Sequence, residues 1–256
     1  MDFGACLCCN SCHIKFIQST ASSTAMSTIY LIPTVLDEMA VHTIPLYIVD
    51  AVKNCQVIFA ENERTARRFL KSICKEIVID DYEWFTIHKA EEEQKQAFRN
   101  NITAGKNIAV ISEAGCPGIA DPGQMLVEVA QQMNAIVKPL VGPSSILLAL
   151  MASGMNGQQF EFVGYLPIDN AEKVKAIAAL ELTSQKKNST QIFIETPYRN
   201  DQLIETILKT CKPNTKLCIA AELTGPNEYI KTKTIAEWKK EKTGFHKKPA
   251  IFLLQS

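Results

Sequence analysis

The segment IAVISEAGCPGIADPG, residues 108–123, indicates the fold class of this chain. Its apolar start, residues 108–111, is typical of a buried strand. Glycines follow at once, and they allow the backbone to turn sharply and to approach a ligand closely. Asp121 and Pro122 are suited to the N-cap and the first position of a helix. The segment therefore predicts a strand, a tight loop and a helix.

The same alternation continues on both sides of this segment. Helical periodicity is clear in residues 124–133, where Met125, Leu126, Val129 and Ala130 follow the i, i+3, i+4 spacing. Strands are predicted at residues 29–33, 56–60, 107–112 and 135–140, and helices at 63–74, 90–103 and 124–133. Strand and helix in turn predict a parallel-rich α/β sheet.

A second α/β unit is predicted after a break at residues 139–143. Threonine and β-branched residues at 229–234 favour an antiparallel hairpin there. Helices are predicted at residues 145–151, 171–182 and 201–211, and strands at 160–163, 190–195, 216–221, 228–233 and 250–254. We thus expect two α/β domains, 27–141 and 142–256, with a ligand cleft between them. Residues 1–25 precede Met26 and are expected to be a disordered extension or a misassigned start.

Composition restricts the class of protein. The chain has 256 residues, of which 27 are basic and 27 acidic, and no apolar run reaches the roughly 18 residues that a membrane span needs. Zero net charge excludes binding of nucleic acid by bulk electrostatics, so any such contact needs a local basic patch. Candidate patches are Arg64, Arg67, Arg68 and Lys71, and the cluster Lys239, Lys240, Lys242, Lys247 and Lys248.

Cysteine usage indicates a reducing compartment. The five cysteines beyond residue 50 are scattered, as in a cytoplasmic protein without disulfides. Four more lie near the N-terminus, where residues 9–13 match the C-x-x-C-H pattern of haem attachment. Because no export signal precedes them and no second ligand pair follows, we predict neither haem nor a metal site at Cys6, Cys8, Cys9, Cys12 and His13.

Common nucleotide and hydrolase motifs are absent from the sequence. There is no G-x-G-x-x-G after the first strand, no phosphate-binding P-loop, no H-E-x-x-H and no G-x-S-x-G. Instead, polar residues follow several strands. Ser144 and Ser145, for example, either cap a helix or hold a polar group of a ligand. Such loops lie at residues 112–123, 141–145, 162–167, 194–199 and 220–224, and together they predict a cleft.

These segments, in this order, resemble the tetrapyrrole methylase superfamily of S-adenosylmethionine-dependent methyltransferases. The most similar branch methylates the ribose 2′-hydroxyl of a cytidine in small-subunit ribosomal RNA. Its S-D-A-G-T-P-x-I-S-D-P-G is similar to S-E-A-G-C-P-G-I-A-D-P-G here. Its P-G-P-S-A, V-G-F-L-P, Y-E-S-P-H-R and A-R-E-L-T correspond to residues 141–145, 163–167, 194–199 and 220–224. The resemblance extends from about Ile29 to the C-terminus.

The resemblance implies two α/β domains, S-adenosylmethionine in the cleft between them and a homodimer. It also implies a ribosomal RNA or small-subunit partner. The implied cofactor contacts are Pro33, Gly115, Cys116, Pro117, Ile119, Ser144, Ser145, Glu195, Ala221, Leu223, Pro249 and Ala250.

Candidate catalytic residues come from two of these motifs. The E-D-T-R-x-T-R segment of the branch is matched by residues 61–67, and the histidine-bearing segment after it by His88. A 2′-hydroxyl nucleophile needs a base, for which Glu61 is the candidate, with Glu195 and Glu222 as alternatives. Arg64 and Arg199 would anchor phosphate or base. Each of these residues could instead have a structural role. Glu61 would then pair with Arg64 on a helix face, and Arg199 would form an ion pair at the surface.

The chain also departs from the branch. No glycine follows Pro33 in the first loop, and Asn62, Glu113 and Tyr198 replace an aspartate, an aspartate and a histidine. Three functions are therefore considered. The first is ribosomal RNA 2′-O-methylation, the second is C-methylation of a tetrapyrrole such as a precorrin, and the third is a non-catalytic paralogue that binds the cofactor or RNA.

Overall fold

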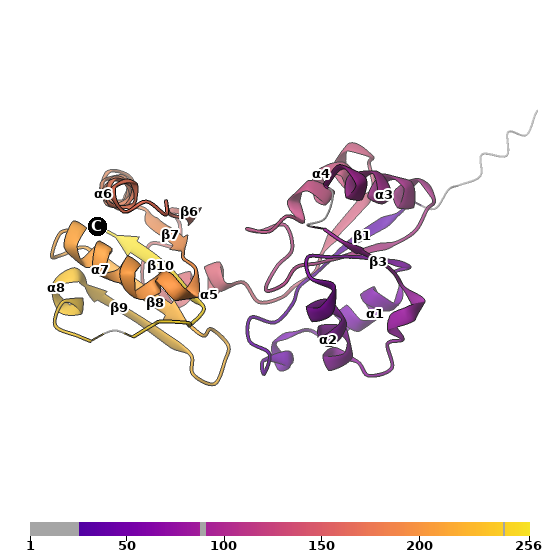
Figure 1. The fold of residues 1–256 in the computed structure, drawn as a ribbon, viewed down its shortest axis with the longest axis horizontal. Coiled ribbons are helices and arrows are strands. Elements are labelled where there is room, and N and C mark those ends of the chain that lie inside the picture. Colours follow the sequence, from indigo (N-terminus) through magenta and orange to yellow (C-terminus); the bar gives the residue numbers. More distant parts are fainter. Residues whose placement is uncertain (1–25, 88–90, 243) are drawn as a thin grey trace, which may run out of the picture.

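The computed structural model describes residues 26–87, 91–242 and 244–256. Figure 1 shows two lobes, the earlier part of the chain in indigo and magenta and the later part in orange and yellow. Each lobe is built on its own five-stranded sheet, and helices pack against both sheets. The chain therefore has the two α/β domains that the sequence predicted. The boundary between residues 141 and 142 stays a prediction.

The first sheet is entirely parallel, with strand order β3-β2-β4-β1-β5. Both of its faces are buried, which explains why its three central strands are nearly continuous apolar runs instead of alternating ones. Its strands are β1 (Thr28–Ile32), β2 (Val57–Ala60), β3 (Glu83–Thr86), β4 (Ile108–Ile111) and β5 (Ile136–Pro139). Its α-helices are α1 (Tyr47–Lys53), α2 (Glu63–Ile73), α3 (Glu91–Thr103) and α4 (Gln124–Gln132).

Two apolar clusters hold this domain together, one on each face of the sheet. On one face, Ile48 of α1 and Leu70 of α2 pack against Ile58. On the other face, Phe98 of α3 and Leu126 of α4 pack against Phe59, whose ring also stacks on Phe85 at 4.6 Å. The sheet is thereby fixed between two helical layers, and only its edges remain for a ligand.

The second sheet is mixed, with strand order β6-β7-β10-β8-β9. Strands β6 and β7 are parallel, and the remaining neighbours are antiparallel. The hairpin of β8 and β9 confirms the interpretation of residues 229–234. The strands are β6 (Phe160–Tyr165), β7 (Thr190–Ile194), β8 (Lys216–Ala221), β9 (Tyr229–Thr234) and β10 (Ala250–Gln255). The helices are α5 (Ser145–Ser153), α6 (Asn170–Lys187), α7 (Asn200–Thr210) and α8 (Ile235–Trp238).

Helix α5 covers one face of the second sheet, and α6 and α7 cover the other. The two domains also touch each other. Leu36, from the loop after β1, packs into the apolar cluster that contains Leu150 of α5 and Leu223 after β8. Beside it, a Cβ placed on Gly225 would lie 2.6 Å from Asp37 Oδ2. The loop after β1 therefore meets the loop after β8.

Six short elements were not predicted from the sequence. They are α1, β3, α8 and the 3-10 helices η1 (Val41–Thr43), η2 (Ile79–Asp81) and η3 (Pro197–Arg199). A further difference concerns the start of α4, where the predicted N-cap was wrong. Helix α4 begins at Gln124 with Gly123 as N-cap, because the Asp121 carboxylate accepts hydrogen bonds within the preceding loop instead. Asp121 orders the glycine-containing loop and does not cap the helix.

Several expectations fall outside the described residues. The N-terminal segment 1–25, with its four cysteines and His13, is among them, and so is His88. In the part of the chain that the structure describes, no group of three or more His, Cys, Asp or Glu side chains could hold a metal ion. No helix in that part is long and apolar enough to cross a membrane.

Candidate active site

Three loops meet at the carboxyl edge of the first sheet. Thr34, after β1, donates its backbone N–H to the carbonyl of Gly115, after β4, at 2.9 Å. Gly142, after β5, lies against the ring of Pro33 so closely that a Cβ on Gly142 would be 2.2 Å from the Cβ of Pro33. Parallel strands present their carboxyl ends at one edge, which is why segments 80 or more residues apart converge there.

The loop after β4 is shaped by two local features. Gly115 adopts φ of +76° and Gly118 φ of +82°, a region in which side chains other than glycine are strained. The Asp121 carboxylate accepts hydrogen bonds from the backbone N–H of Gly118 at 2.9 Å and of Gly123 at 2.6 Å. The two glycines and the Asp121 carboxylate together set the shape of the loop.

Cys116 connects this loop to the one after β5. Its thiol donates to the carbonyl of Pro143 at 3.5 Å and, more weakly, to that of Gly142 at 3.9 Å. Burial raises the pKa of the Cys116 thiol, and the nearby Asp121 carboxylate raises it further. Cys116 therefore stays protonated at neutral pH and acts as a hydrogen-bond donor.

The N-terminus of α5 lies in the same group of loops. Ser144 is the N-cap residue, but its side chain accepts no capping hydrogen bond. The first backbone N–H groups of a helix have no partners within the helix and carry a partial positive charge. Ser144, Ser145 and this helix end can therefore receive a carboxylate or a hydroxyl group of a ligand.

A second group of predicted residues gathers at one end of the second sheet. Ala221 at the end of β8 pairs with Ala250 at the start of β10, and Glu222 donates its backbone N–H to the Pro249 carbonyl at 2.9 Å. Glu222 and Thr224 adopt positive φ of 52° and 66°, a region that is unfavourable for residues other than glycine. Among the described residues, the buried Thr224 hydroxyl has no hydrogen-bond partner.

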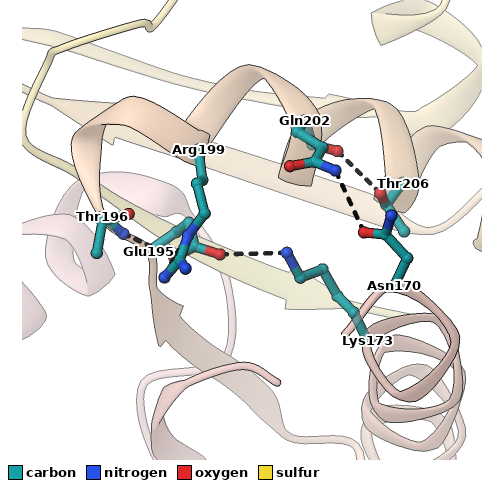
Figure 2. A network of polar contacts seen from close by, with 7 residues as sticks. All are labelled: Asn170, Lys173, Glu195, Thr196, Arg199, Gln202 and Thr206. Carbon is teal, nitrogen blue, oxygen red and sulfur yellow. Dashed lines mark hydrogen bonds and ion pairs between the residues drawn. The ribbon is translucent and has the colours of Figure 1, made fainter. Parts of the chain in front are cut away.

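Glu195 lies at the same end, directly after β7. Its side chain is fully buried, and Figure 2 shows it between Lys173 of α6 and Arg199. Arg199 donates two hydrogen bonds to Glu195 Oε1, at 2.7 and 2.9 Å, and Thr196 N–H donates a third at 2.8 Å. The Lys173 ammonium, itself buried, lies 3.4 Å from Glu195 Oε2.

Burial alone would raise the pKa of Glu195. The Thr196 hydrogen bond and the two cations outweigh it, so the pKa is lowered and the carboxylate stays ionised. Both of its oxygens are already occupied by groups of this chain. Glu195 and Arg199 thus form one ion-paired unit with Lys173 at the end of β7, and their assigned roles stay predictions.

A cavity of about 320 Å³ opens between the loop after β1, helix α2 and residues 112–114. Its floor is apolar and includes Leu36 and Phe69, while Glu38 and Arg68 lie at its rim and form an ion pair at 3.0 Å. Residues 112–114 lead directly into the Gly115 loop. The cavity therefore adjoins the region where the cofactor contacts are predicted, without including them.

Glu61 and Arg64, the two candidate catalytic residues near the start of α2, have different surroundings. Glu61 precedes the N-cap Asn62, so it does not lie on the helix face, and its Oε2 accepts the Glu113 backbone N–H at 2.8 Å. The exposed Arg64 side chain makes no hydrogen bond or ion pair with the residues that the structure describes. The alternative of a helix-face pair between Glu61 and Arg64 is therefore not formed.

The structure brings Pro33, Gly115 and Cys116 together with the start of α5. It brings Glu195, Arg199, Ala221 and Ala250 to one end of the second sheet. Contacts across the predicted domain boundary run from Pro33 and Cys116 to Gly142 and Pro143, and from Leu36 and Asp37 to the second domain.

Lys173 was missed by sequence reasoning, although it shares the inward-facing positions of α6 with Ile177 and Glu181 at four-residue spacing. A charged residue at an inward-facing position of a helix could have indicated a buried ion pair. The cavity residues gave no signal, because they come from three separate segments.

Comparison with known proteins defines the class to which this fold and site belong. Residues 41–239 match the family model described as Tetrapyrrole (Corrin/Porphyrin) Methylases. The chain belongs to this family and is an S-adenosylmethionine-dependent methyltransferase.

The similar curated proteins include two named "Ribosomal RNA small subunit methyltransferase I". The one from Buchnera aphidicola subsp. Schizaphis graminum is 32% identical, over 88% of this chain and 77% of that protein. The one from Bacillus subtilis is 30% identical, over 83% of this chain and 69% of that protein.

Solved structures with the same fold include two methyltransferases. One is the methyltransferase CobJ, with a TM-score of 0.59, 14% identity and coverage of 90% of this chain and 93% of that chain. The other is the uroporphyrin-III C-methyl transferase of Thermus thermophilus complexed with S-adenyl homocysteine. Its TM-score is 0.52 at 16% identity, over 90% of this chain and 98% of that chain. These likenesses establish the fold.

The residues present suit S-adenosylmethionine. Its amino-acid end carries a carboxylate, for which the uncapped N-terminus of α5 provides N–H groups. Its hydroxyl and amino groups need polar partners, and the buried Thr224 hydroxyl is available. Apolar side chains such as Leu223 and Leu36 form the domain contact beside them, where an adenine ring can be covered.

Proposed function

We propose that this enzyme methylates the ribose 2′-hydroxyl of a cytidine in small-subunit ribosomal RNA. The observation that carries the proposal is the identity of 30–32%, over more than four-fifths of the chain, with relatives named for this RNA substrate. The tetrapyrrole methylases with the same fold are only 14–16% identical. The substrate is therefore inferred from the RNA methyltransferases.

In this proposal, both groups of strand-end residues hold the cofactor. Pro33, Gly115, Cys116, Pro117 and Ile119 would contact it from the first domain, with Ser144 and Ser145. Glu195, Ala221, Leu223, Pro249 and Ala250 would approach it from the second domain. The cofactor supplies an activated methyl group, so the work of the protein is to align the nucleophile and to exclude water.

The cavity beside α2 would take the target nucleoside. Arg64 precedes Thr65 of the cavity lining and is exposed without a partner among the described residues, so it is available for an RNA phosphate. Glu61 holds the Glu113 backbone N–H and thereby the loop that lines the cavity. A proton acceptor for the 2′-hydroxyl is needed here, and we propose Glu61 for that role, with Arg199 as a second anchor.

The direct test uses purified protein, tritium-labelled S-adenosylmethionine and small ribosomal subunits from cells lacking this gene. We expect label in the ribosomal RNA and, after nuclease digestion, in a 2′-O-methylated cytidine. Uroporphyrinogen III is the comparison substrate. Label in the tetrapyrrole and not in RNA would overturn the proposal, and so would an unchanged ribose-methylation map in cells without the gene.

We further propose a cytoplasmic homodimer. Large apolar side chains are exposed on the first loops and on α5, including Leu46 at 87%, Val141 at 71% and Met151 at 78%. Tyr47, which follows Leu46 in the chain, accepts the Val141 backbone N–H through its hydroxyl at 2.7 Å. Exposed apolar surface of this kind is typical of subunit interfaces. Light scattering that gives a monomer mass at micromolar concentration would contradict the dimer.

A further inference from the structure

An exposed aromatic and basic surface lies beside the Glu195 ion pair. Tyr198, in the turn after β7, is 69% exposed, and the exposed His246 ring meets it edge-on with 5.8 Å between ring centroids. The ammonium of Lys247 lies over the Tyr198 ring, 5.9 Å from its centroid. We refer to Tyr198, His246 and Lys247 as the platform.

The platform is held in place by its backbone. Lys247 donates its backbone N–H to the Pro197 carbonyl at 2.9 Å while adopting a positive φ of 63°, which is unfavourable for lysine. The Asn200 side chain donates to the carbonyls of Phe245 and Lys248, at 3.1 and 2.7 Å. The segment before β10 is thus tied to the segment after β7, and a ligand would bind a largely preorganised surface.

The local charge is positive, although the chain as a whole is neutral. Lys173 and Arg199 share the single carboxylate of Glu195, which leaves one positive charge in excess. Lys248 is balanced by Glu222, at 2.8 Å. Lys247 has no acidic partner among the described residues. Asp201 lies nearby, and its carboxylate accepts the Phe245 backbone N–H.

The platform lies at the end of the second sheet that carries the proposed cofactor contacts. Tyr198 follows Glu195 by three residues, and Lys247 precedes Pro249 by two. The Pro249 carbonyl in turn accepts the Glu222 N–H, in the turn that leads to Gly225 and the first domain. A ligand on the platform would therefore extend toward the proposed cofactor contacts.

We propose that the platform binds single-stranded RNA next to the methylated nucleotide. An unpaired base would stack on the Tyr198 and His246 rings, and Lys247 would contact the adjacent phosphate. Exposed aromatic rings interleaved with cations bind single-stranded nucleic acid in this way, since every base has a stacking face. The proposal rests on the proposed function, and it adds a binding site outside the cavity beside α2.

The test compares full-length variants for their KM with small ribosomal subunits from cells lacking the gene. Stacking of one base on an aromatic ring strengthens binding by at least about five-fold. We therefore expect Tyr198→Ala to raise KM about five-fold or more. Tyr198→Phe keeps the ring and should stay near the wild-type KM. Affinity for S-adenosylmethionine, measured by calorimetry, should be unchanged in both. The affinity for RNA falls with salt concentration, and each phosphate contact steepens this fall. Lys247→Ala should reduce the slope of log affinity against log salt concentration by the amount expected for about one phosphate contact.

Matched controls lie at the other end of the same sheet. Phe160 is exposed at the start of β6, opposite Thr190, and Lys187 is exposed at the end of α6. Phe160→Ala and Lys187→Ala should leave KM at the wild-type value. The proposal is overturned if Tyr198→Ala behaves like Phe160→Ala, or if Tyr198→Phe is as impaired as Tyr198→Ala.

The outcome for the wild-type protein separates the two proposals. If the wild type methylates the ribosomal RNA and the Tyr198→Ala variant has the same KM, the platform does not bind RNA and the proposed function stands. If the wild type transfers no methyl group to RNA, the function is wrong. A fluorescent single-stranded oligocytidylate then tests the platform directly, and equal affinity for the wild type and Tyr198→Ala would overturn it.

Discussion

Gly142 and Pro33 touch so closely that no side chain fits between them. A Cβ placed on Gly142 would lie 2.2 Å from the Pro33 Cβ and 2.4 Å from its Cγ. This contact joins the loop after β1 to the loop that leads into α5. Two of the proposed cofactor-binding segments therefore hold each other in position.

Gly142→Ala should consequently weaken both the fold and the cofactor site. Overpacking at such a contact costs about 1–3 kcal/mol, so we expect a loss of that size in the free energy of unfolding. Affinity for S-adenosylmethionine should fall as well. Gly157→Ala is the control, because no atom lies within 4 Å of a Cβ placed there. Equal stability of the two variants in urea would show that the contact is not tight.

Lys173→Met should destabilise the protein strongly, since it removes one cation from a buried carboxylate. Loss of one member of a buried pair costs about 3 kcal/mol. Lys175→Met, two residues along the same helix, removes an exposed lysine paired with Glu172 and should cost less than about 0.5 kcal/mol. Urea denaturation at pH 7 measures both, and similar losses for the two variants would contradict the buried ion pair.

The same ion pair predicts a pH dependence. The folded-state pKa of Glu195 lies below its ordinary value of 4.5, because the Thr196 hydrogen bond, Arg199 and Lys173 outweigh burial. The stabilisation is therefore present above pH 4.5 and is lost as the pH falls through the lowered pKa. The gap in stability between the wild type and Lys173→Met should narrow below that pH. A gap that stays constant down to the acid transition would be inconsistent with an ionised Glu195.

Arg64→Ala tests the proposed RNA anchor. Because the side chain is exposed and has no partner among the described residues, its removal should leave the unfolding free energy unchanged. A lost charge-assisted contact with phosphate should lower kcat/KM for ribosomal subunits about ten-fold or more. Arg99→Ala, on α3 at the opposite face of the sheet, is the control. An unchanged kcat/KM in Arg64→Ala would remove Arg64 from the site.

Alkylation of Cys116 tests the environment of the glycine loop. Burial and the Asp121 carboxylate raise its pKa above the ordinary 9.0, so the reactive thiolate forms only at higher pH. The rate of reaction with iodoacetamide, followed on the Cys116 peptide by mass spectrometry, should therefore reach half of its maximum above pH 9.0. S-adenosylhomocysteine should slow the reaction. A plateau by pH 8, or no protection by this ligand, would contradict the assignment.

Local sequence patterns predicted most of the elements but not all of them. Strands β1, β2 and β4 are short apolar runs bounded by turn residues, and they were recognised because both faces of a parallel sheet are buried. Strand β3 was missed, since it is an edge strand with partly exposed, mixed residues. The start of α4 was misplaced because Asp121 binds N–H groups within its own loop. Propensity does not distinguish between these two uses of an aspartate.

The sequence by itself determined the two α/β domains, the family and the order of the strand-end loops, because these depend on local periodicity and on contiguous motifs. Only the tertiary structure decided which side chains meet. Lys173 and Glu195 are 22 residues apart, and they pair because α6 covers the face of the sheet at which β7 ends. Tyr198 and His246 are 48 residues apart, and they meet because β7 and β10 are antiparallel neighbours. Contacts between distant segments depend on strand order and register, which no local motif encodes.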